Sequence, residues 1–539
     1  MAPYDYPLLL KYVLASGIRI APEQKIYYRD QWEYTYAEMY QRVLQLGGAL
    51  KALGLKTGSK VGIIEWDSHR YLEMYFAVPG IGAVMHTINP RLAPADVAYT
   101  MLHAEDEVVI FHEDFLPLIE KLRPQLATVK KYIIISDKET PPETPFADTD
   151  YETFLTSATP LEELPDFDEN TQATLSYTTG TTGKPKGVYF THRQLVLHTL
   201  AEATTFGSLT DFGGITKRDV YMPLTPLFHV HAWGVPYSTT MIGMKQVYPG
   251  RYEPSMLLKL VLTHKVTFSH CVPTILQMVV GAPGIEKFDL RGWKIVIGGA
   301  RLTKGLAQSA QKLGIHLYAG YGMSETAPLL TIAFLKPTFG EMSEEEKLDY
   351  HIKTGLPVPL VSLRVVNADG EEVARDGKER GEIQVRTPWL TPGYLKEPER
   401  SEALWEGGWL HTGDVATVDA HGYVQIVDRL KDVIKSGGEW ITSLELENLL
   451  SLHPAVNEAA VIGVPDEKWG ERPLAIVVPA EGAKPTAAAL QEHLKQYATQ
   501  GVITDWAVPD LYEFVEALPK TSVGKIDKKA LRAQYGGGI

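Results

Sequence analysis

The sequence predicts a multidomain α/β protein. A large N-terminal part would hold two layered α/β subdomains plus a small β-barrel, followed by a small, mobile α+β C-terminal domain. Three observations predict this class. The 539 residues exceed the size of one ordinary core. Short apolar strands alternate with helical patterns up to about Thr331, as in mainly parallel sheets. Beyond about residue 355 strands become short, glycines frequent and helices scarce.

The first α/β series begins with an amphipathic helical pattern over residues 36–53. Its inward-facing residues are expected to be Met39, Val43, Leu46 and Leu50. The elements expected after it are a buried strand at 61–65, a helix at 71–77, and strands at 82–86, 108–111 and 132–135. Strands that alternate with helices in this way predict the first layered subdomain.

A second series of the same kind runs from Asp219 to about Thr331. The strand at 295–297 ends in Gly298-Gly299-Ala300, and the strand at 315–318 ends in Gly320-Tyr321-Gly322. Because α/β proteins bind ligands at strand ends, both glycine-containing segments are candidate ligand contacts.

The pattern of predicted elements changes after residue 355, where strands are short and helices are few. Three glycine-associated strands at 363–366, 381–386 and 422–427 suggest a small antiparallel barrel. From Asp432 onward a compact α+β unit of roughly 110 residues is expected, a usual size for a domain. It should contain a helix near 443–450 and a strand at 458–462.

Composition narrows the class of function. The formal net charge of −14 argues against nonspecific binding to nucleic acid or anionic membranes. The single cysteine, Cys271, excludes an internal disulfide and is expected to be a buried structural thiol rather than a nucleophile. The N-terminus lacks the features of a signal peptide, and no window approaches the ~18 apolar residues of a membrane span. These features favour a cytoplasmic protein without stable membrane insertion.

The most informative segment is residues 177–187, Tyr-Thr-Thr-Gly-Thr-Thr-Gly-Lys-Pro-Lys-Gly. A short strand at 173–176 precedes it, and a helix is expected from about His192, with Leu195, Val196 and Leu200 at helical spacing. Glycines can turn backbone amides toward an anion, and threonine and lysine can contact phosphate oxygens. The spacing is not that of a Walker A loop. A phosphate-binding loop and a flexible surface loop both fit this segment taken alone.

Four further segments follow the Thr/Gly/Lys loop in order. They are Pro226-Leu227-Phe228-His229, the 321–326 segment Tyr-Gly-Met-Ser-Glu-Thr, the 409–414 segment leading to 428–432, and the 519–526 segment Pro-Lys-Thr-Ser-Val-Gly-Lys-Ile. Together the five segments resemble the adenylate-forming (AMP-binding) superfamily of acyl-CoA synthetases, luciferases and peptide-synthetase adenylation domains. The resemblance covers nearly the whole chain and implies two reactions: a carboxylate attacks the α-phosphate of ATP, and a thiol then displaces AMP.

The resemblance also implies roles for individual residues. Thr178 and Glu325 would hold a Mg²⁺ ion, and Lys525 would be the catalytic lysine that reaches the α-phosphate. Tyr321 would stack on adenine, and Asp414 would accept hydrogen bonds from the ribose. The implied ATP or AMP contacts are Thr178, Thr179, Gly180, Thr181, Thr182, Gly183, Lys186, Gly299, Ala300, Gly320, Tyr321, Gly322, Thr326, Asp414, Arg429 and Lys525. Lys528 and Lys529, by contrast, are interpreted as solvated surface charges.

The same resemblance predicts domains at 1–430 and 431–539, with a hinge at Lys431 that would alternate between the half-reactions. The C-terminal face used for the thiol step would include Lys435, Gly437, Gly438 and Trp440. Coenzyme A is the expected thiol.

The acid pocket would include His229, Val230, Trp233, Gly298 and Gly299, with His229 near the carboxylate. The segment after Phe228 has no aspartate to pair with an α-ammonium group, so an amino acid substrate is not expected. Segments such as 75–80, 86–92 and 434–440 are similar to bacterial long- and medium-chain fatty acyl-CoA synthetases. In long-chain members a tryptophan at this position gates an acyl tunnel; as a pocket floor, Trp233 would instead favour short or aromatic acids.

The leading hypothesis is therefore a fatty acid:CoA ligase. The alternatives are an aryl- or short-chain acid:CoA ligase and, from another class, a non-catalytic homologue that binds nucleotide or acyl-adenylate. The presence of Thr178, Glu325, Asp414 and Lys525 argues against the last of these. Some bacterial relatives dimerise through the N-terminal domain, which makes a homodimer an expectation here.

Overall fold

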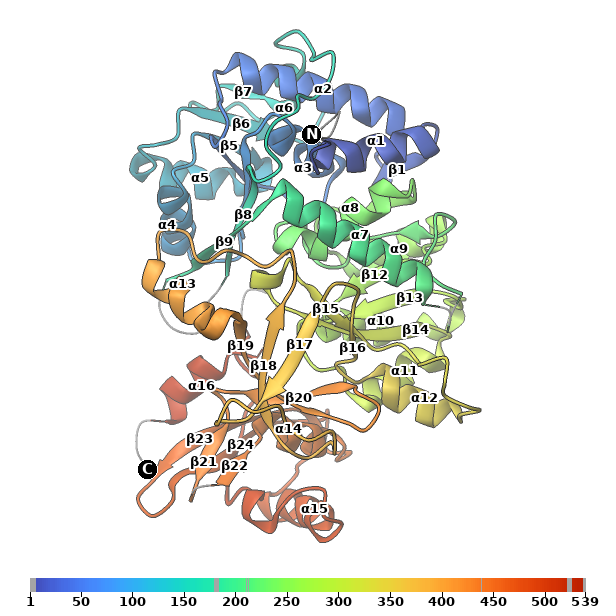
Figure 1. Cartoon of the computed structure of the whole chain (residues 1–539), viewed down its shortest axis with the longest axis vertical. Helices are drawn as coiled ribbons and strands as arrows, with labels where there is room; N and C mark the ends of the chain where they lie inside the picture. The colour runs from blue at the N-terminus through green and yellow to red at the C-terminus, as the bar shows by residue number, and fades with distance from the viewer. Residues whose placement is uncertain are drawn as a thin grey trace, which may run out of the picture.

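The computed structural model describes residues 6–178, 184–209, 211, 213–437, 439–520 and 526–536, with Glu439 and Trp440 described in their backbone only. Two α/β layers make up the upper and right-hand parts of the view in Figure 1. An antiparallel sheet lies below them, and the C-terminal unit lies at the bottom. The predicted class, an α/β multidomain protein with a small α+β C-terminal unit, is confirmed.

The first layer is a seven-stranded sheet in the order β7-β6-β5-β3-β4-β8-β9, parallel except for the last strand. Its strands are β3 (Lys60–Ile64), β4 (Val84–Thr87), β5 (Val108–His112), β6 (Lys131–Ile135), β7 (Thr149–Asp150), β8 (Gln172–Thr178) and β9 (Lys186–Thr191). The associated helices are α1 (Leu10–Ile20), α2 (Tyr36–Ala52), α3 (His69–Gly80), α4 (Pro94–Ala104), α5 (Leu116–Leu122) and α6 (Tyr151–Leu155). A capping box between Thr35 and Glu38 starts α2, and all four of its predicted inward residues are buried.

The second layer is a nine-stranded sheet in the order β16-β15-β14-β13-β12-β10-β11-β1-β2. Its strands are β1 (Lys25–Tyr28), β2 (Trp32–Thr35), β10 (Val220–Tyr221), β11 (Lys245–Tyr248), β12 (Phe268–Cys271), β13 (Lys294–Ile297), β14 (His316–Gly322), β15 (Leu329–Ile332) and β16 (Leu356–Pro357). Its helices are α7 (His192–Ser208), α8 (Val235–Met241), α9 (Pro254–His264), α10 (Pro273–Val280), α11 (Lys304–Lys312) and α12 (Glu344–His351). The N-terminal hairpin β1–β2 joins this sheet through β11, a long-range pairing that the sequence patterns did not predict.

Two details differ from the sequence-based expectation. The strand expected to end before Gly320 continues through Gly322, because β14 pairs with the antiparallel strand β15 over these residues. In α7, Leu195 and Val196 are buried but Leu200 is 44% exposed, so Leu200 lies on the solvent side of the helix.

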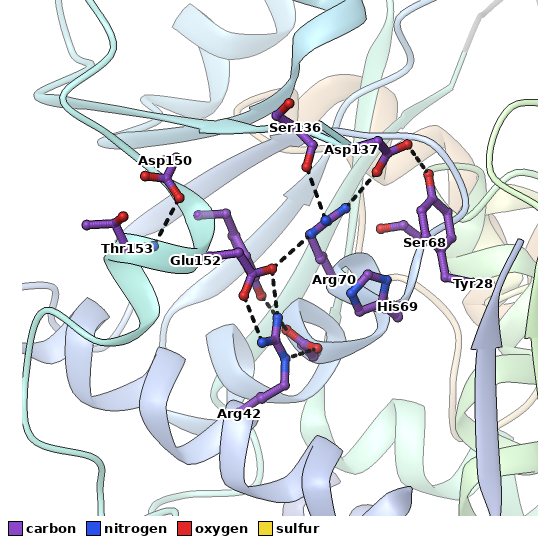
Figure 2. A network of polar contacts seen from close by, with 12 residues as sticks. Tyr28, Arg42, Ser68, His69, Arg70, Ser136, Asp137, Asp150, Glu152 and Thr153 are labelled. Atoms are coloured by element: carbon purple, nitrogen blue, oxygen red, sulfur yellow. Dashed lines mark hydrogen bonds and ion pairs between the residues drawn. The ribbon is translucent and has the colours of Figure 1, made fainter. Parts of the chain in front are cut away.

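Asp137 links the two layers through polar contacts (Figure 2). Arg70 at the start of α3 donates to Asp137, which follows β6, at 3.0 Å, and to Glu152 of α6 at 3.1 Å. Tyr28 of β1 donates to the other oxygen of Asp137 at 2.7 Å. Asp137 is therefore a shared contact between the seven-stranded and nine-stranded sheets.

The strands predicted as a small barrel form a four-stranded antiparallel sheet. Its strands, in sheet order, are β17 (Ser362–Val366), β18 (Gly381–Arg386), β19 (Leu410–Val418) and β20 (Val424–Arg429). The short helix α13 (Pro398–Leu404) lies between β18 and β19 in the chain.

The C-terminal unit contains a five-stranded sheet and its own hydrophobic clusters. Its elements are β21 (Ile434–Ser436), β22 (Glu439–Ile441), α14 (Ser443–Ser451), β23 (Val456–Asp466), β24 (Gly470–Pro479), α15 (Ala487–Thr499), β25 (Leu511–Phe514) and α16 (Lys528–Tyr535). Two clusters of buried apolar residues consist only of residues between 434 and 531. The predicted helix near 443–450 and the strand at 458–462 are confirmed.

Cys271 ends β12 and is fully buried, as expected for a structural thiol. Burial raises the pKa of the Cys271 thiol well above its usual range. Over the part of the chain that the structure describes, no helix is long and apolar enough to cross a membrane.

Candidate active site

The β8–β9 hairpin positions the described ends of the Thr/Gly/Lys loop. Thr178, the last residue of β8, is the register partner of Lys186, the first residue of β9. The five residues between Thr178 and Lys184 lie outside the described residues. The backbone positions of Thr178 and Lys186, two residues of the predicted phosphate site, are therefore neighbours on paired strands.

Tyr394 connects this hairpin to the predicted metal ligand Glu325. The Lys186 ammonium lies 4.5 Å from the centroid of the Tyr394 ring, and the Tyr394 hydroxyl donates to Glu325 Oε1 at 2.7 Å. Glu325 is 7% exposed, and its backbone carbonyl accepts from the amide of Thr391. Burial and the negative charge of Glu325 raise the pKa of Tyr394 well above its usual range, so this hydroxyl remains a donor. Lys186 thus contacts Tyr394, and Tyr394 contacts Glu325, so three segments distant in sequence lie together.

A second group of polar contacts forms around Asp414 in the middle of β19. Tyr321 of β14 donates its hydroxyl to Asp414 Oδ2 at 2.6 Å. Arg429, the register partner of Asp414 on β20, approaches Asp414 Oδ1 at 3.2 Å. The predicted adenine, ribose and phosphate contacts therefore come from two different sheets and meet at one buried carboxylate.

Glycines permit close backbone approach in this region. A Cβ atom at Gly322 would lie 1.7 Å from the Pro328 carbonyl oxygen, so only glycine fits there. At the end of β13, Gly298 is buried while Gly299 and Ala300 are exposed. Gly299 has φ +77°, and this left-handed residue turns the chain at the open strand end. Gly320 lies beside β13 at the same edge.

Thr326 has a structural position within the 321–326 segment. It is fully buried, and its hydroxyl donates to the carbonyl oxygens of Met323 and Pro328. These contacts hold the turn that presents Glu325, and the predicted contact of Thr326 with nucleotide stays a prediction.

Three of the predicted acid-pocket residues, His229, Val230 and Trp233, lie on or next to one unusual turn, and Gly298 and Gly299 follow β13. His229 is partly buried, Val230 is buried, and Trp233 is partly buried against the same core as Tyr321. A Cβ atom at Gly298 would lie 3.0 Å from Cη2 of Trp233. The Trp233 ring also packs on His270, with 5.1 Å between ring centroids. The indole therefore covers Gly298, as a gate and a pocket floor would both require.

In the C-terminal unit, Lys431 and Lys435 are exposed. Gly437 donates its amide to the Trp469 carbonyl, and its α-carbon faces the Trp469 and Trp506 rings. Several other predicted residues lie outside the described residues or are described in their backbone only: Thr179, Gly180, Thr181, Thr182, Gly183, Gly438, Trp440 and Lys525.

The interpretation of Lys528 as a solvated charge is wrong. Its side chain is 11% exposed, pairs with Glu447 of α14 at 2.7 Å and donates to Ser443 Oγ at 2.6 Å. Ser443 in turn donates to Asp428 of β20 through its hydroxyl at 2.8 Å. Lys529, the next residue, is exposed as expected. Lys528 was misassigned because its partners lie more than 80 positions away in the sequence.

Sequence reasoning also missed Tyr394. The available signal was Pro392-Gly393-Tyr394, an aromatic residue directly after a turn dipeptide. A Cβ atom at Gly393 would lie 2.5 Å from Ser401 Oγ, so the turn requires glycine directly before Tyr394.

The family assignment agrees with this geometry. The model of the AMP-binding enzyme family matches residues 18–395, and that of the AMP-binding enzyme C-terminal domain matches residues 445–525. The chain belongs to this family, and it is an AMP-forming acid–thiol ligase.

Relatives of known activity support that class. A long-chain-fatty-acid–CoA ligase of Thermus thermophilus is 46% identical over 93% of this chain and 90% of its own length. A 3-methylmercaptopropionyl-CoA ligase of Ruegeria pomeroyi is 38% identical over 98% of this chain and 97% of its own length. Among solved structures, an anthranilate CoA ligase in complex with anthranoyl-AMP superposes with a TM-score of 0.85. It is 26% identical, with 99% of both chains covered.

Proposed function

We propose that the protein activates a fatty acid with ATP and transfers the acyl group to coenzyme A. The observation that carries this proposal is the convergence of Lys186, Tyr394 and Glu325 beside the Tyr321–Asp414–Arg429 group. Together they form a cationic and hydroxyl-bearing phosphate region next to a buried carboxylate suited to ribose. The similarity to a long-chain-fatty-acid–CoA ligase over 93% of the chain supports the choice of acid.

In the first step, a carboxylate oxygen of the acid bonds to the α-phosphorus of ATP, and the bond to the pyrophosphate oxygen breaks. In the second, the thiolate sulfur of coenzyme A bonds to the acyl carbon, and AMP leaves with the carboxylate oxygen. Two anions meet in the first step, so neutralising charge and aligning the reactants are the main tasks of the protein. Lys186 and Arg429 supply charge within the described site, and we propose that Lys525 supplies it at the α-phosphate.

The donor set suits a hard divalent cation. Glu325 offers a buried carboxylate, and Thr178 a hydroxyl at the end of β8. Mg²⁺ in nucleotide sites uses one or two protein oxygen ligands together with phosphates and water. Thr178 and Glu325 would hold the ion, which would supply positive charge to offset that of the phosphates. The Tyr394 hydroxyl holds one oxygen of Glu325, which leaves the other side of that carboxylate for a ligand.

A second candidate is an aryl- or short-chain acid. The close packing of Trp233 over Gly298 favours it, because a fixed indole would shorten the pocket. The 38% identity to a 3-methylmercaptopropionyl-CoA ligase shows that a short acid occurs among relatives of this chain.

The deciding experiment measures pyrophosphate release and acyl-CoA formation over a panel of acids. The panel should contain straight-chain acids from four to sixteen carbons, benzoate, 3-methylmercaptopropionate and an amino acid. Turnover that peaks with medium or long chains supports a fatty acid ligase. A preference for benzoate or the four-carbon acid replaces it with the second candidate, and no turnover with any acid revives the non-catalytic alternative.

The predicted catalytic lysine is tested separately. Lys525→Ala should abolish pyrophosphate release while stabilisation by AMP against heat largely survives, because AMP lacks the leaving group. Lys529→Ala is the matched control, since Lys529 is an exposed lysine of the same segment. Normal pyrophosphate release by Lys525→Ala would remove Lys525 from the mechanism.

We also propose that the chain divides at residues 430 and 431 and that Lys431 is the hinge. The separate apolar clusters after residue 434 support this division. Proline restricts φ and removes an amide donor, so Lys431→Pro should impair thioester formation more than adenylate formation. Equal losses in separate assays of the two half-reactions would contradict the hinge.

A cytoplasmic location and a homodimer complete the proposal. The single, buried Cys271 supports a reducing compartment. Fractionation of the native host tests the location, and light scattering of the purified chain tests for the dimer.

A further inference from the structure

The segment that carries Trp233 has a strained backbone. Val230, His231, Ala232, Trp233 and Gly234 all have positive φ, at 45°, 57°, 46°, 61° and 82°. Four of these five residues have a Cβ atom, for which left-handed conformations are disfavoured. Such a run persists only where the surrounding structure holds it in place, so its neighbours on each side are informative.

Three buried side chains from the first α/β layer hold the backbone just before this turn. Tyr75 of α3 donates its hydroxyl to the Leu227 carbonyl at 2.5 Å. Asp67, in the loop after β3, accepts from the Leu227 amide at 2.8 Å. Thr87, the last residue of β4, donates to the Phe228 carbonyl at 2.9 Å. Each of the three side chains is at most 2% exposed.

The C-terminal side of the turn is fixed by close packing of Gly234 against His198. A Cβ atom at Gly234 would lie 2.7 Å from the His198 ring of α7. That ring is itself held, because His198 Nε2 accepts from the Leu329 amide at 3.2 Å. Because both ends are fixed, the turn is held in one conformation, and Trp233 packs against Gly298.

Two of the three holding residues, Asp67 and Tyr75, are themselves fixed by surrounding contacts. Asp67 also accepts from the Tyr252 hydroxyl at 2.6 Å, which ties it to the second layer. Tyr75 lies on α3, and Arg70 in the first turn of that helix forms ion pairs with Asp137 and Glu152 (Figure 2). The first layer therefore serves as a rigid base for a turn that lies in the second.

We propose that Asp67, Tyr75 and Thr87 are positioning residues of the acid site, which hold the left-handed turn so that Trp233 lies over Gly298. They act through the turn and not on the acid itself. On this view the first layer, which supplied no predicted acid contact, sets which chain lengths fit. The inference rests on the proposed acid:CoA ligase function.

The test uses two tyrosines of the same helix. Tyr75→Phe removes the hydrogen bond to Leu227. Tyr71→Phe is the matched control, because Tyr71 is equally buried and its hydroxyl has no hydrogen-bond partner among the described residues. KM for the preferred acid, KM for ATP and the chain-length profile are measured for both.

For Tyr75→Phe, KM for the acid should rise about fivefold, the effect of losing one hydrogen bond, while KM for ATP stays within about twofold. The profile should broaden, because a looser turn lets the Trp233 indole leave Gly298. Thr87→Val should likewise raise KM for the acid but not KM for ATP. Thr87→Ser, which keeps the hydroxyl, should retain the wild-type values.

Two results overturn the inference. One is a Tyr75→Phe profile equal to that of Tyr71→Phe; the other is an equal rise in KM for acid and ATP, which indicates a general structural defect. If Tyr75→Phe does not fold, the Thr87→Val and Thr87→Ser pair decides alone. Wild-type protein that turns over no acid overturns the proposed function and this inference with it. Normal wild-type turnover with unchanged variants overturns the inference only.

Discussion

The turn at 226–234 and the contact between β20 and the C-terminal unit are both polar, but they are built differently. At the turn, buried side chains bond to backbone groups of Leu227 and Phe228. At the C-terminal contact, side chains bond to side chains: Ser443 donates its hydroxyl to Asp428 of β20 at 2.8 Å. Arg380 of the large part pairs with Glu445 at 3.5 Å, with both side chains about one-third exposed.

The difference indicates what each region can do. Backbone hydrogen bonds have fixed partners and fixed directions, so the turn keeps one geometry. Partly exposed ion pairs have shallow angular preferences and can exchange partners at small cost. A region built like the C-terminal contact suits a unit proposed to rotate, and a region built like the turn suits a pocket of defined length.

The largest effect is expected behind this contact, at the buried pair of Lys528 and Glu447 inside the C-terminal unit. Lys528→Met leaves Glu447 and Asp428 without their cation in a site where burial already raises the pKa of both carboxyl groups. Removing one partner of a buried pair costs about 3–5 kcal/mol. Denaturant unfolding should show this loss, whereas Lys528→Arg retains most of the stability. A Lys528→Met protein as stable as the exposed control Lys529→Met would mean that this pair contributes nothing.

Tyr394 is an intermediate case, a neutral hydroxyl bonded to a charged carboxylate. Tyr394→Phe should weaken the Glu325 site by about 1.5–3 kcal/mol, the usual value for a hydrogen bond to a charged group. We expect KM for Mg-ATP to rise by roughly tenfold or more, with KM for the acid little changed. A larger change in the acid KM would place Tyr394 in the acid site instead.

The buried carboxyl group of Glu202, on α7, makes a pH-dependent contribution to stability that can be measured. It is 1% exposed, and desolvation raises its pKa from 4.5 to about 8, with a hydrogen bond from Ser238 opposing the shift. A raised folded-state pKa stabilises the fold below pH 4.5, and this contribution is lost as pH rises toward 8.

Glu202→Gln keeps the shape and cannot ionise. Its stability advantage over the wild type should therefore grow by about 1.4 kcal/mol for each pH unit between 5 and 8. Thermal unfolding at pH 5, 6, 7 and 8 measures this trend. A constant difference across the series would show that Glu202 does not titrate in that window.

The smallest effect is expected for Arg380→Ala. Its pair with Glu445 is long and partly exposed, so the loss should be about 0.2–1 kcal/mol and should shrink in high salt. A loss as large as that of Lys528→Met would erase the contrast between the buried pair inside the C-terminal unit and the exposed pair at its contact with the large part.

Local patterns were enough to predict the parallel strands of the first layer and the C-terminal helix and strand, because hydrophobic periodicity reports burial directly. They were not enough for β1, whose parallel partner β11 lies more than 200 residues away. Lys528 shows the same limit: its own segment is polar, and its burial depends on α14. The turn at 230–233 is invisible in sequence, since its non-glycine residues give no signal of positive φ.

Cys271 has a practical consequence. It is the one cysteine of the chain, it is fully buried, and burial raises its pKa, so it should react slowly with maleimides. A cysteine introduced at exposed Lys529, with a second at exposed Leu53, would therefore take up a donor and acceptor dye without first removing a native thiol. Single-molecule energy transfer between them could follow the proposed rotation of the C-terminal unit during turnover in an otherwise unaltered protein.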